Sequence, residues 1–214
     1  MKLKKIASIC GKSKCIFLYD VRDSEGTVTQ WIGDGGAAYP AFDLPYLERE
    51  SVFAVLDVPD KQREKYYFRH ITEAPQEINF ADTDPKEKYI SDPKMSVVYD
   101  GLILKPLQTR QGITFIKGGY LGPLEDVLAV ARLYERITPS GGTYIVVKAG
   151  LLIEAVITPY DALHEGFVSE VERLARLCRE ALSIQRERAA AVMENQTRLF
   201  GSENEDGQEG GGGE

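Results

Sequence analysis

The tripeptide GKS at 11–13 is the first stretch whose residue types could do chemistry, because a lysine and a hydroxyl behind a glycine can hold a nucleotide phosphate. A phosphate-binding loop also needs a glycine five residues earlier and a helix directly after the serine. Position 6 is Ile6, and the apolar run 14–20 that follows predicts a strand. We therefore interpret residues 11–13 as a hairpin turn.

A second glycine-rich stretch, GDGGAAYP at 33–40, could be considered for dinucleotide binding. The spacing G-x-G-x-x-G is not met, since Gly33 and Gly35 are followed by Ala38 where the third glycine would stand. Paired glycines instead permit positive φ at no steric cost. This stretch therefore predicts a tight turn.

Acid–base or nucleophilic catalysis would need a histidine close to a carboxylate and a nucleophile. The two histidines, His70 and His164, lie in an expected strand and near an expected helix start, and spacing pairs neither with a nucleophile. Three aspartates, Asp20, Asp34 and Asp100, lie at the ends of expected strands. Carboxylates at such positions occur in catalytic sites but are more common in turns. We predict no catalytic residues and favour a non-enzymatic protein over an enzyme.

The three cysteines, Cys10, Cys15 and Cys178, form neither a disulfide framework nor a zinc site. Their number is odd, and the four residues between Cys10 and Cys15 exceed a CxxC spacing. A zinc site would need about four soft ligands in a tetrahedron. We therefore predict buried thiols, no metal and no cofactor.

The elements that would position these residues belong to an α+β fold. In the first unit, 1–72, apolar runs and alternation predict strands at 14–20, 26–34 and 65–71, and a helix over 44–56. A polar segment with three prolines, 73–94, predicts a linker.

The second unit, 95–158, repeats this plan. It is predicted to contain a helix at 123–137 and a hairpin at 143–158 that turns near Ala149-Gly150. The patterns K-x4-Y-D and GG-x3-P occur once in each unit in the same order. Two alternatives explain these shared patterns: a duplication that produced two strand-rich units with one helix each, or chance similarity.

A long helix is predicted over 159–200, with Thr158 and Pro159 at its start. Steps of four and three place five residues on one stripe, which could be core or an oligomerisation surface: Phe167, Val171, Leu174, Cys178 and Ala181. Gln185 and Arg188 interrupt this stripe. We expect the first half of the helix to dock on the body or on a second copy and the second half to project; the alternative is that the whole helix packs within the chain.

Charge is concentrated at the end of the sequence. The net charge is −7, of which −5 lies in 201–214, leaving −2 for residues 1–200. Strong autonomous nucleic-acid binding usually shows a clustered basic footprint, and this near-neutral body has a short one at most, in the lysines of its first 14 residues. No apolar run approaches the ~20 residues of a membrane span, and the apolar part of the N-terminus is too short for a signal peptide. We predict a cytoplasmic protein without membrane contact.

The segment 201–214 is acidic and glycine-rich, which predicts a disordered tail. Leu199 and Phe200 stand side by side just before it. They could fold back on the helix, join a self-association seam, or act as a short linear ligand. For the last alternative, QTRLF at 196–200 resembles the bacterial sliding-clamp-binding peptide, whose pattern is Q-x-x-L-F.

In this resemblance Gln196, Leu199 and Phe200 match the three fixed positions, and Arg198 departs mildly from the small or acidic residues usual at its position. The resemblance implies docking on the bacterial sliding clamp. Our leading hypothesis is a non-enzymatic accessory or adaptor protein of DNA replication or recombination. The alternative is an oligomeric structural or assembly protein, for example of a mobile element, that self-associates through its C-terminal helix.

Overall fold

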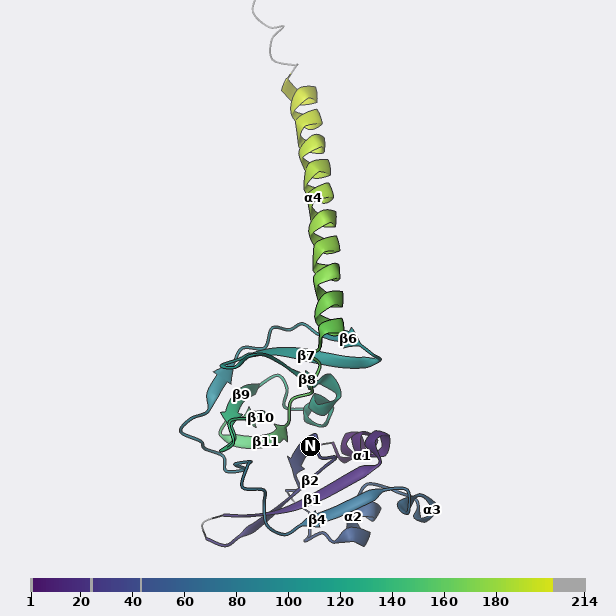
Figure 1. The fold of residues 1–214 in the computed structure, drawn as a ribbon, viewed down its shortest axis with the longest axis vertical. Helices are drawn as coiled ribbons and strands as arrows, with labels where there is room; N and C mark the ends of the chain where they lie inside the picture. The colour runs from purple at the N-terminus through teal and green to yellow at the C-terminus, as the bar shows by residue number, and fades with distance from the viewer. Residues whose placement is uncertain (1, 24, 43, 202–214) are drawn as a thin grey trace, which may run out of the picture. The chain divides into compact units, whose positions relative to one another are not determined.

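The computed structural model describes residues 2–23, 25–42 and 44–201, with side chains to residue 193. The chain divides into two compact units, 1–161 and 162–214. Helix and strand are mixed in the first unit, and a single long helix forms the described part of the second (Figure 1). The predicted α+β class is confirmed.

The first unit is built on an eight-stranded sheet in the order β4-β1-β2-β3-β11-β10-β9-β5. Its pairs are antiparallel except β1–β4, which is parallel. The strands are β1 (Cys15–Arg22), β2 (Val28–Gly33), β3 (Ala37–Pro40), β4 (Tyr67–Ile71), β5 (Lys88–Ile90), β9 (Ala131–Ile137), β10 (Thr143–Ala149) and β11 (Leu152–Ile157).

A smaller sheet and four short helices complete this unit. The sheet has the order β6-β7-β8, with β6 (Val97–Tyr99), β7 (Leu102–Thr109) and β8 (Gly112–Lys117). The helices are α1 (Leu3–Ser13), α2 (Arg49–Val55), α3 (Asp60–Arg63) and the 3-10 helix η1 (Gly118–Leu124).

The large sheet is buried on both faces because successive side chains of a strand point to opposite sides. In β10, Ile145 and Val147 belong to the main core, which also takes in residues of α1, α2, η1, β7 and β8. Tyr144 and Val146 face the other way, into a second cluster with Trp31 and Phe80. The polar segment 73–94 supplies Phe80, so it covers a face of the sheet, and it also supplies β5 at the sheet edge.

The two predicted strand-rich units share the one large sheet. β3 from the first unit pairs with β11 from the second, with Ala38 opposite Val156 and Ala37 opposite Ile157. The short patterns that suggested duplication fall in unlike places: Lys14-Tyr19-Asp20 lies along β1 in the large sheet, whereas Lys94-Tyr99-Asp100 lies along β6 in the small one.

Most predicted strands are confirmed, and so is the 143–158 hairpin, whose turn contains Gly150 at φ +63°. The predicted helix at 123–137 is wrong, because η1 ends at Leu124 and Ala131–Ile137 form β9. In a strand the adjacent Glu135 and Arg136 point to opposite faces, and each is buried with a partner of its own, Arg110 for Glu135 and Glu87 for Arg136.

The prediction of a hairpin turn at 11–13 is also wrong. These residues end α1, an amphipathic helix that buries Ile6 and Cys10. The reversal into β1 occurs one residue later, at Lys14, whose φ of 55° is left-handed. The apolar part of this segment was judged too short for a signal peptide, and no helix was predicted there.

In the second unit, α4 (Glu165–Gly201) is one continuous helix (Figure 1). It begins later than the predicted residue 159, because the His164 ring nitrogen Nδ1 accepts a hydrogen bond from the Phe167 backbone N–H at 3.3 Å, as an N-cap does. Residues 202–214, where the disordered tail was predicted, lie outside the described residues. Of the helices in the described chain, none combines the length and the apolar character needed to cross a membrane.

Candidate functional site

Three glycine-containing stretches that are distant in sequence meet at a pocket of about 360 Å³ in the first unit. They are the end of α1, the β2–β3 turn and the start of η1, and the β6–β7 turn closes the pocket. Its volume lies within the range of small-molecule sites. The lining residues are Ile9, Lys12, Ser13, Asp34, Gly101, Leu102, Ile103, Lys117, Gly119 and Tyr120.

The end of α1 brings Lys12 and Ser13 to this pocket. Burial of Ile6 and Cys10 fixes the rotation of this helix. The Ser13 hydroxyl lies 3.3 Å from the backbone carbonyls of Ile9 and Cys10, so it helps to cap its own helix. Lys12 remains exposed at the pocket rim.

The β2–β3 turn presents Asp34. One carboxylate oxygen, Oδ1, accepts hydrogen bonds from the backbone N–H groups of Gly36 (3.0 Å) and Ala37 (3.1 Å). The other, Oδ2, accepts one from the Tyr120 hydroxyl at 3.2 Å. A Cβ atom at residue 36 would lie 2.2 Å from the Tyr120 oxygen, so only glycine allows Tyr120 to approach Asp34 here.

The ionisation of the groups next to Asp34 opposes nucleophilic chemistry. Burial, and then the Asp34 charge, raises the pKa of the Cys10 thiol to about 12. The same two causes raise the pKa of the Tyr120 hydroxyl. Both groups therefore stay protonated at neutral pH, and neither the thiolate nor the phenolate is available as a nucleophile.

Lys117 supplies a second cation to the pocket. Its ammonium group lies 5.7 Å from the Tyr120 ring centroid and 5.1 Å from that of Tyr160, which is cation–π distance. Within the described part of the chain, no carboxylate lies within ion-pair distance of Lys12 or Lys117. Since the Asp34 oxygens are already engaged, the pocket can receive a ligand with an anionic group and an apolar part, held by the two lysines and by Ile9, Leu102 and Ile103.

A histidine–carboxylate pair lies elsewhere in this unit. Because β4 pairs in parallel with β1, His70 stands beside Leu18, and its Nε2 lies 2.9 Å from Oδ1 of the buried Asp20. Gln30 (2.9 Å) and Tyr46 (2.7 Å) donate to the same carboxylate. Burial alone would raise the pKa of Asp20, but these hydrogen bonds outweigh it and hold the pKa below its ordinary value.

Sequence reasoning did not bring Asp20 and His70 together, because the β1–β4 pairing joins residues fifty positions apart. Among the described residues, no serine, threonine or cysteine hydrogen-bonds to His70. The group therefore lacks the nucleophile of a catalytic triad. It joins three elements of the fold: β1, β2 and β4.

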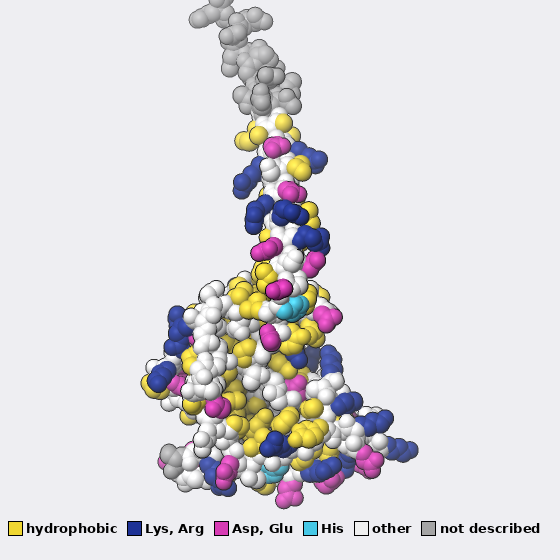
Figure 2. Space-filling model, in the orientation of Figure 1, with side chains coloured by type: hydrophobic (Ala, Val, Ile, Leu, Met, Phe, Trp, Pro, Cys, Tyr) yellow, Lys and Arg dark blue, Asp and Glu magenta, His cyan; other side chains and the backbone are white. Residues whose placement is uncertain are grey.

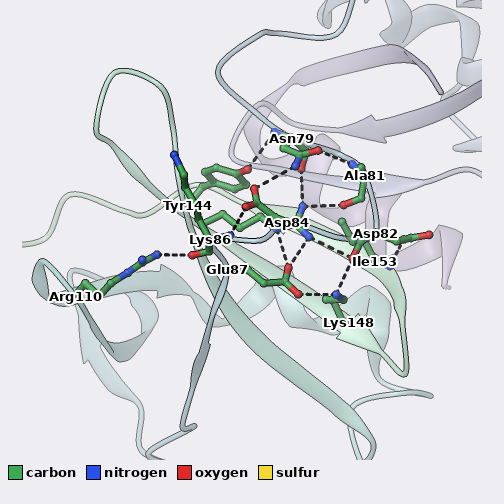
Figure 3. A network of polar contacts seen from close by, with 11 residues as sticks. Asn79, Ala81, Asp82, Asp84, Lys86, Glu87, Arg110, Tyr144, Lys148 and Ile153 are labelled. Carbon is green, nitrogen blue, oxygen red and sulfur yellow. Dashed lines mark hydrogen bonds and ion pairs between the residues drawn. The ribbon is translucent and has the colours of Figure 1, made fainter. Parts of the chain in front are cut away.

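A third polar cluster is a buried charge network (Figure 3). Arg136 is 0% exposed and binds Glu87 through Nε (3.0 Å) and a terminal nitrogen (2.6 Å). Its other terminal nitrogen donates to the backbone carbonyls of Asn79 (2.9 Å) and Ala81 (2.8 Å). Lys148 bonds the other Glu87 oxygen at 2.8 Å and the Asp82 carbonyl at 2.7 Å. Arg136 and Lys148 share the single carboxylate of Glu87 and complete their hydrogen bonds with backbone carbonyls, so the network fastens segment 79–87 to β9 and β10.

The partner-binding residues predicted from sequence fall on α4. Positions 196, 199 and 200 have helical backbone, and the side chains of Gln196, Leu199 and Phe200 lie outside the described residues. In the predicted stripe, Phe167 is buried, whereas Val171, Leu174, Cys178 and Ala181 are exposed. No group of histidine, cysteine and carboxylate side chains that could hold a metal occurs among the described residues.

Comparison with known proteins assigns no family. No protein-family model matches this sequence, and no match is found among curated proteins or solved structures.

Proposed function

We propose that this protein is a cytoplasmic, non-enzymatic adaptor that attaches to a bacterial sliding clamp through QTRLF at 196–200. The observation that carries the proposal is the sequence of these five residues and their place at the end of α4, next to the acidic segment 201–214. Docking would bring the body close to replicating DNA without a strong DNA-binding site of its own.

The motif has the chemistry of a short linear ligand. Adjacent aliphatic and aromatic side chains, Leu199 and Phe200, can fill neighbouring apolar pockets, while the Gln196 amide satisfies polar groups at their rim. The five glutamate and aspartate residues of 201–214 would be repelled by DNA phosphates, which keeps this end of the chain off nucleic acid.

The helical backbone at 196–200 is compatible with docking in an extended form. The last turn of a helix frays readily, because its final carbonyl groups lack partners within the helix. Binding would therefore unwind the end of α4 at small cost. A single peptide of this size should bind with an affinity of roughly micromolar order, because ordering it offsets part of the contact energy.

The first unit supports an adaptor rather than a catalyst. Its pocket combines two lysines with apolar side chains, while the neighbouring Cys10 and Tyr120 stay protonated and the Asp34 oxygens are occupied by three donors. This chemistry is suited to holding a ligand or a peptide of a replication or recombination partner.

The test is a binding measurement between the full chain and a purified bacterial sliding clamp, by surface plasmon resonance or isothermal titration calorimetry. The double variant Leu199→Ala/Phe200→Ala should lose binding. The matched control is Leu151→Ala/Leu152→Ala, which removes another exposed apolar pair, at the β10–β11 turn, and should bind like the wild type. Equal binding by the wild type and the 199/200 variant, or no binding by the wild type, would overturn the proposal.

A further inference from the structure

Helix α4 carries a second apolar line, which shares Val171 and Cys178 with the stripe predicted at 167–181 but otherwise consists of different residues. We call it the seam; it consists of Val168, Val171, Ala175, Cys178, Leu182, Gln185, Ala189 and Val192. Steps of three and four alternate along its whole length, which is the heptad spacing of a coiled coil. Among the seven possible heptad registers of 168–192, only this one contains no charged residue.

The seam is exposed along the helix. Val168, Val171, Leu182 and Val192 all rank among the exposed large apolar side chains, and Figure 2 shows apolar side chains along α4 between arginines and glutamates. Helices in proteins owe most of their stability to packing of an apolar face, and isolated helices are marginal in water. An exposed seam seven turns long therefore requires a partner.

We propose that the seam pairs with the seam of a second copy of this chain, as an antiparallel coiled coil. The seam is symmetric about residue 180, so antiparallel pairing matches every member with another member. The facing pairs are Val168 with Val192, Val171 with Ala189, Ala175 with Gln185, and Cys178 with Leu182, each counted from one copy to the other.

Charge selects the antiparallel orientation. Residues 165–172 contain three glutamates and no basic residue, whereas 173–188 contain five arginines and two glutamates. Antiparallel pairing sets Glu172 of one copy beside Arg186 of the second, whereas parallel pairing would set the two acidic starts side by side. The antiparallel form has one unfavourable contact: near its centre, Arg179 of one copy lies beside Arg179 of the second.

The dimer does not depend on the proposed clamp docking, because the seam ends at Val192, before Gln196. It extends that proposal, however. An antiparallel pair carries one QTRLF segment at each end, so the two motifs could bind to one clamp or to two different clamps. Avidity would then strengthen a contact that is weak on its own.

The first experiment is sedimentation equilibrium of the full chain, read against the 23.8 kDa chain mass. Wild type should sediment as a dimer, and Leu182→Glu, which places a charge in the seam, should sediment as a monomer. Leu177→Glu is the matched control, because Leu177 is similarly exposed (45% against 50% for Leu182) but lies outside the seam; it should remain dimeric.

Fluorescence of Trp31, the single tryptophan, reports whether each variant keeps its folded body. A monomeric wild type, or equal dissociation by Leu177→Glu and Leu182→Glu with folded bodies, would overturn the proposal.

The second experiment tests orientation by disulfide cross-linking in a Cys15→Ser/Cys178→Ala background, in which the seam remains apolar at position 178. Val171→Cys/Ala189→Cys should form a covalent dimer on mild oxidation, because these positions face each other across an antiparallel pair. Each single cysteine variant should remain unlinked, since its two copies lie about 27 Å apart along the axis, beyond the reach of a disulfide. Efficient linking by Val171→Cys alone would show a parallel pair, and no linking by the double variant would exclude the proposed register.

Discussion

Segment 73–87 and helix α4 differ in whether their chemical character matches their surroundings. Segment 73–87 is polar, yet Phe80 packs against Trp31, and the backbone carbonyls of Asn79, Ala81 and Asp82 accept hydrogen bonds from buried cations. Helix α4 has regular backbone hydrogen bonding, yet its apolar seam is exposed. The irregular segment is held by contacts with other parts of the same chain, whereas the apolar seam of the regular helix remains exposed.

This difference shows that polarity along the sequence does not decide what a segment contacts. A polar loop can be held in place when buried partners meet each of its groups, as Arg136 and Lys148 do here. A helix with an uncovered apolar line indicates a partner outside the chain.

The largest effect is expected from Arg136→Met. Removing the guanidinium leaves Glu87 with a single cationic partner and removes the donor to the backbone carbonyls of Asn79 and Ala81. Breaking a buried ion pair in this way should cost about 3–5 kcal/mol of unfolding free energy. Urea denaturation followed by Trp31 fluorescence measures it.

The matched control for this change is Arg132→Met. Arg132 lies on the same strand, β9, but is exposed, so the same substitution should change the free energy by less than about 0.5 kcal/mol. Similar losses in both variants would show that Arg136 contributes little beyond the strand itself.

A smaller and pH-dependent effect is expected from Glu87→Gln. Burial alone would raise the pKa of Glu87, but hydrogen bonds from Lys148 and Arg136 outweigh it and hold the pKa below its ordinary value. The wild type should therefore exceed the variant by about 1.5–3 kcal/mol at neutral pH. Because the folded pKa is depressed, this advantage is present above the unfolded pKa of about 4.3 and is lost as pH falls through the folded pKa.

Urea titrations of both proteins from neutral pH to pH 3 would measure this profile. A difference between wild type and Glu87→Gln that stayed constant down to the acid end would contradict the proposed ionic origin of the stabilisation.

For the open seam, Arg179→Gln should tighten the dimer by roughly twofold, because like charges facing each other cost about 0.2–0.5 kcal/mol. Sedimentation equilibrium at low ionic strength measures it, and added salt should reduce the difference. Weaker association of the variant would mean that Arg179 does not meet its own copy.

The smallest effect is expected from Leu182→Glu on the body. Because 1–161 and 162–214 are separate compact units, the free energy of unfolding of the body should change by less than about 0.5 kcal/mol, although the dimer is lost. Urea denaturation followed by Trp31 fluorescence measures it. A large destabilisation of the body would show that the two regions are not independent.

Local patterns were sufficient for part of this fold. Alternation in 143–158 predicted the β10–β11 hairpin, and the three-and-four spacing beyond Phe167 predicted a long helix. The same patterns failed at 123–137, where apolar spacing suits a helix but pairing with β10 and β5 makes a strand. They also missed α1, whose burial depends on Ile6 and Cys10 alone.

Local patterns could not predict the candidate site either, because its residues are distant from one another in the sequence. GKS and GDGG were each interpreted as a separate turn, and nothing near them in sequence indicated that Lys12, Asp34 and Tyr120 would line one pocket. Likewise, Asp20 and His70 approach because β1 and β4 pair in parallel.

The sequence by itself determined the α+β class, the C-terminal helix, its charge-free seam and the QTRLF segment, because each depends on spacing within a few helical turns or on composition. Only the tertiary structure decided that 131–137 is a strand, that segment 73–87 is fixed by Arg136 and Lys148, and that the end of α1, the β2–β3 turn and the start of η1 meet at a pocket. Those features depend on contacts between residues far apart in the chain, and hydrophobic periodicity is too short in range to encode which strands pair.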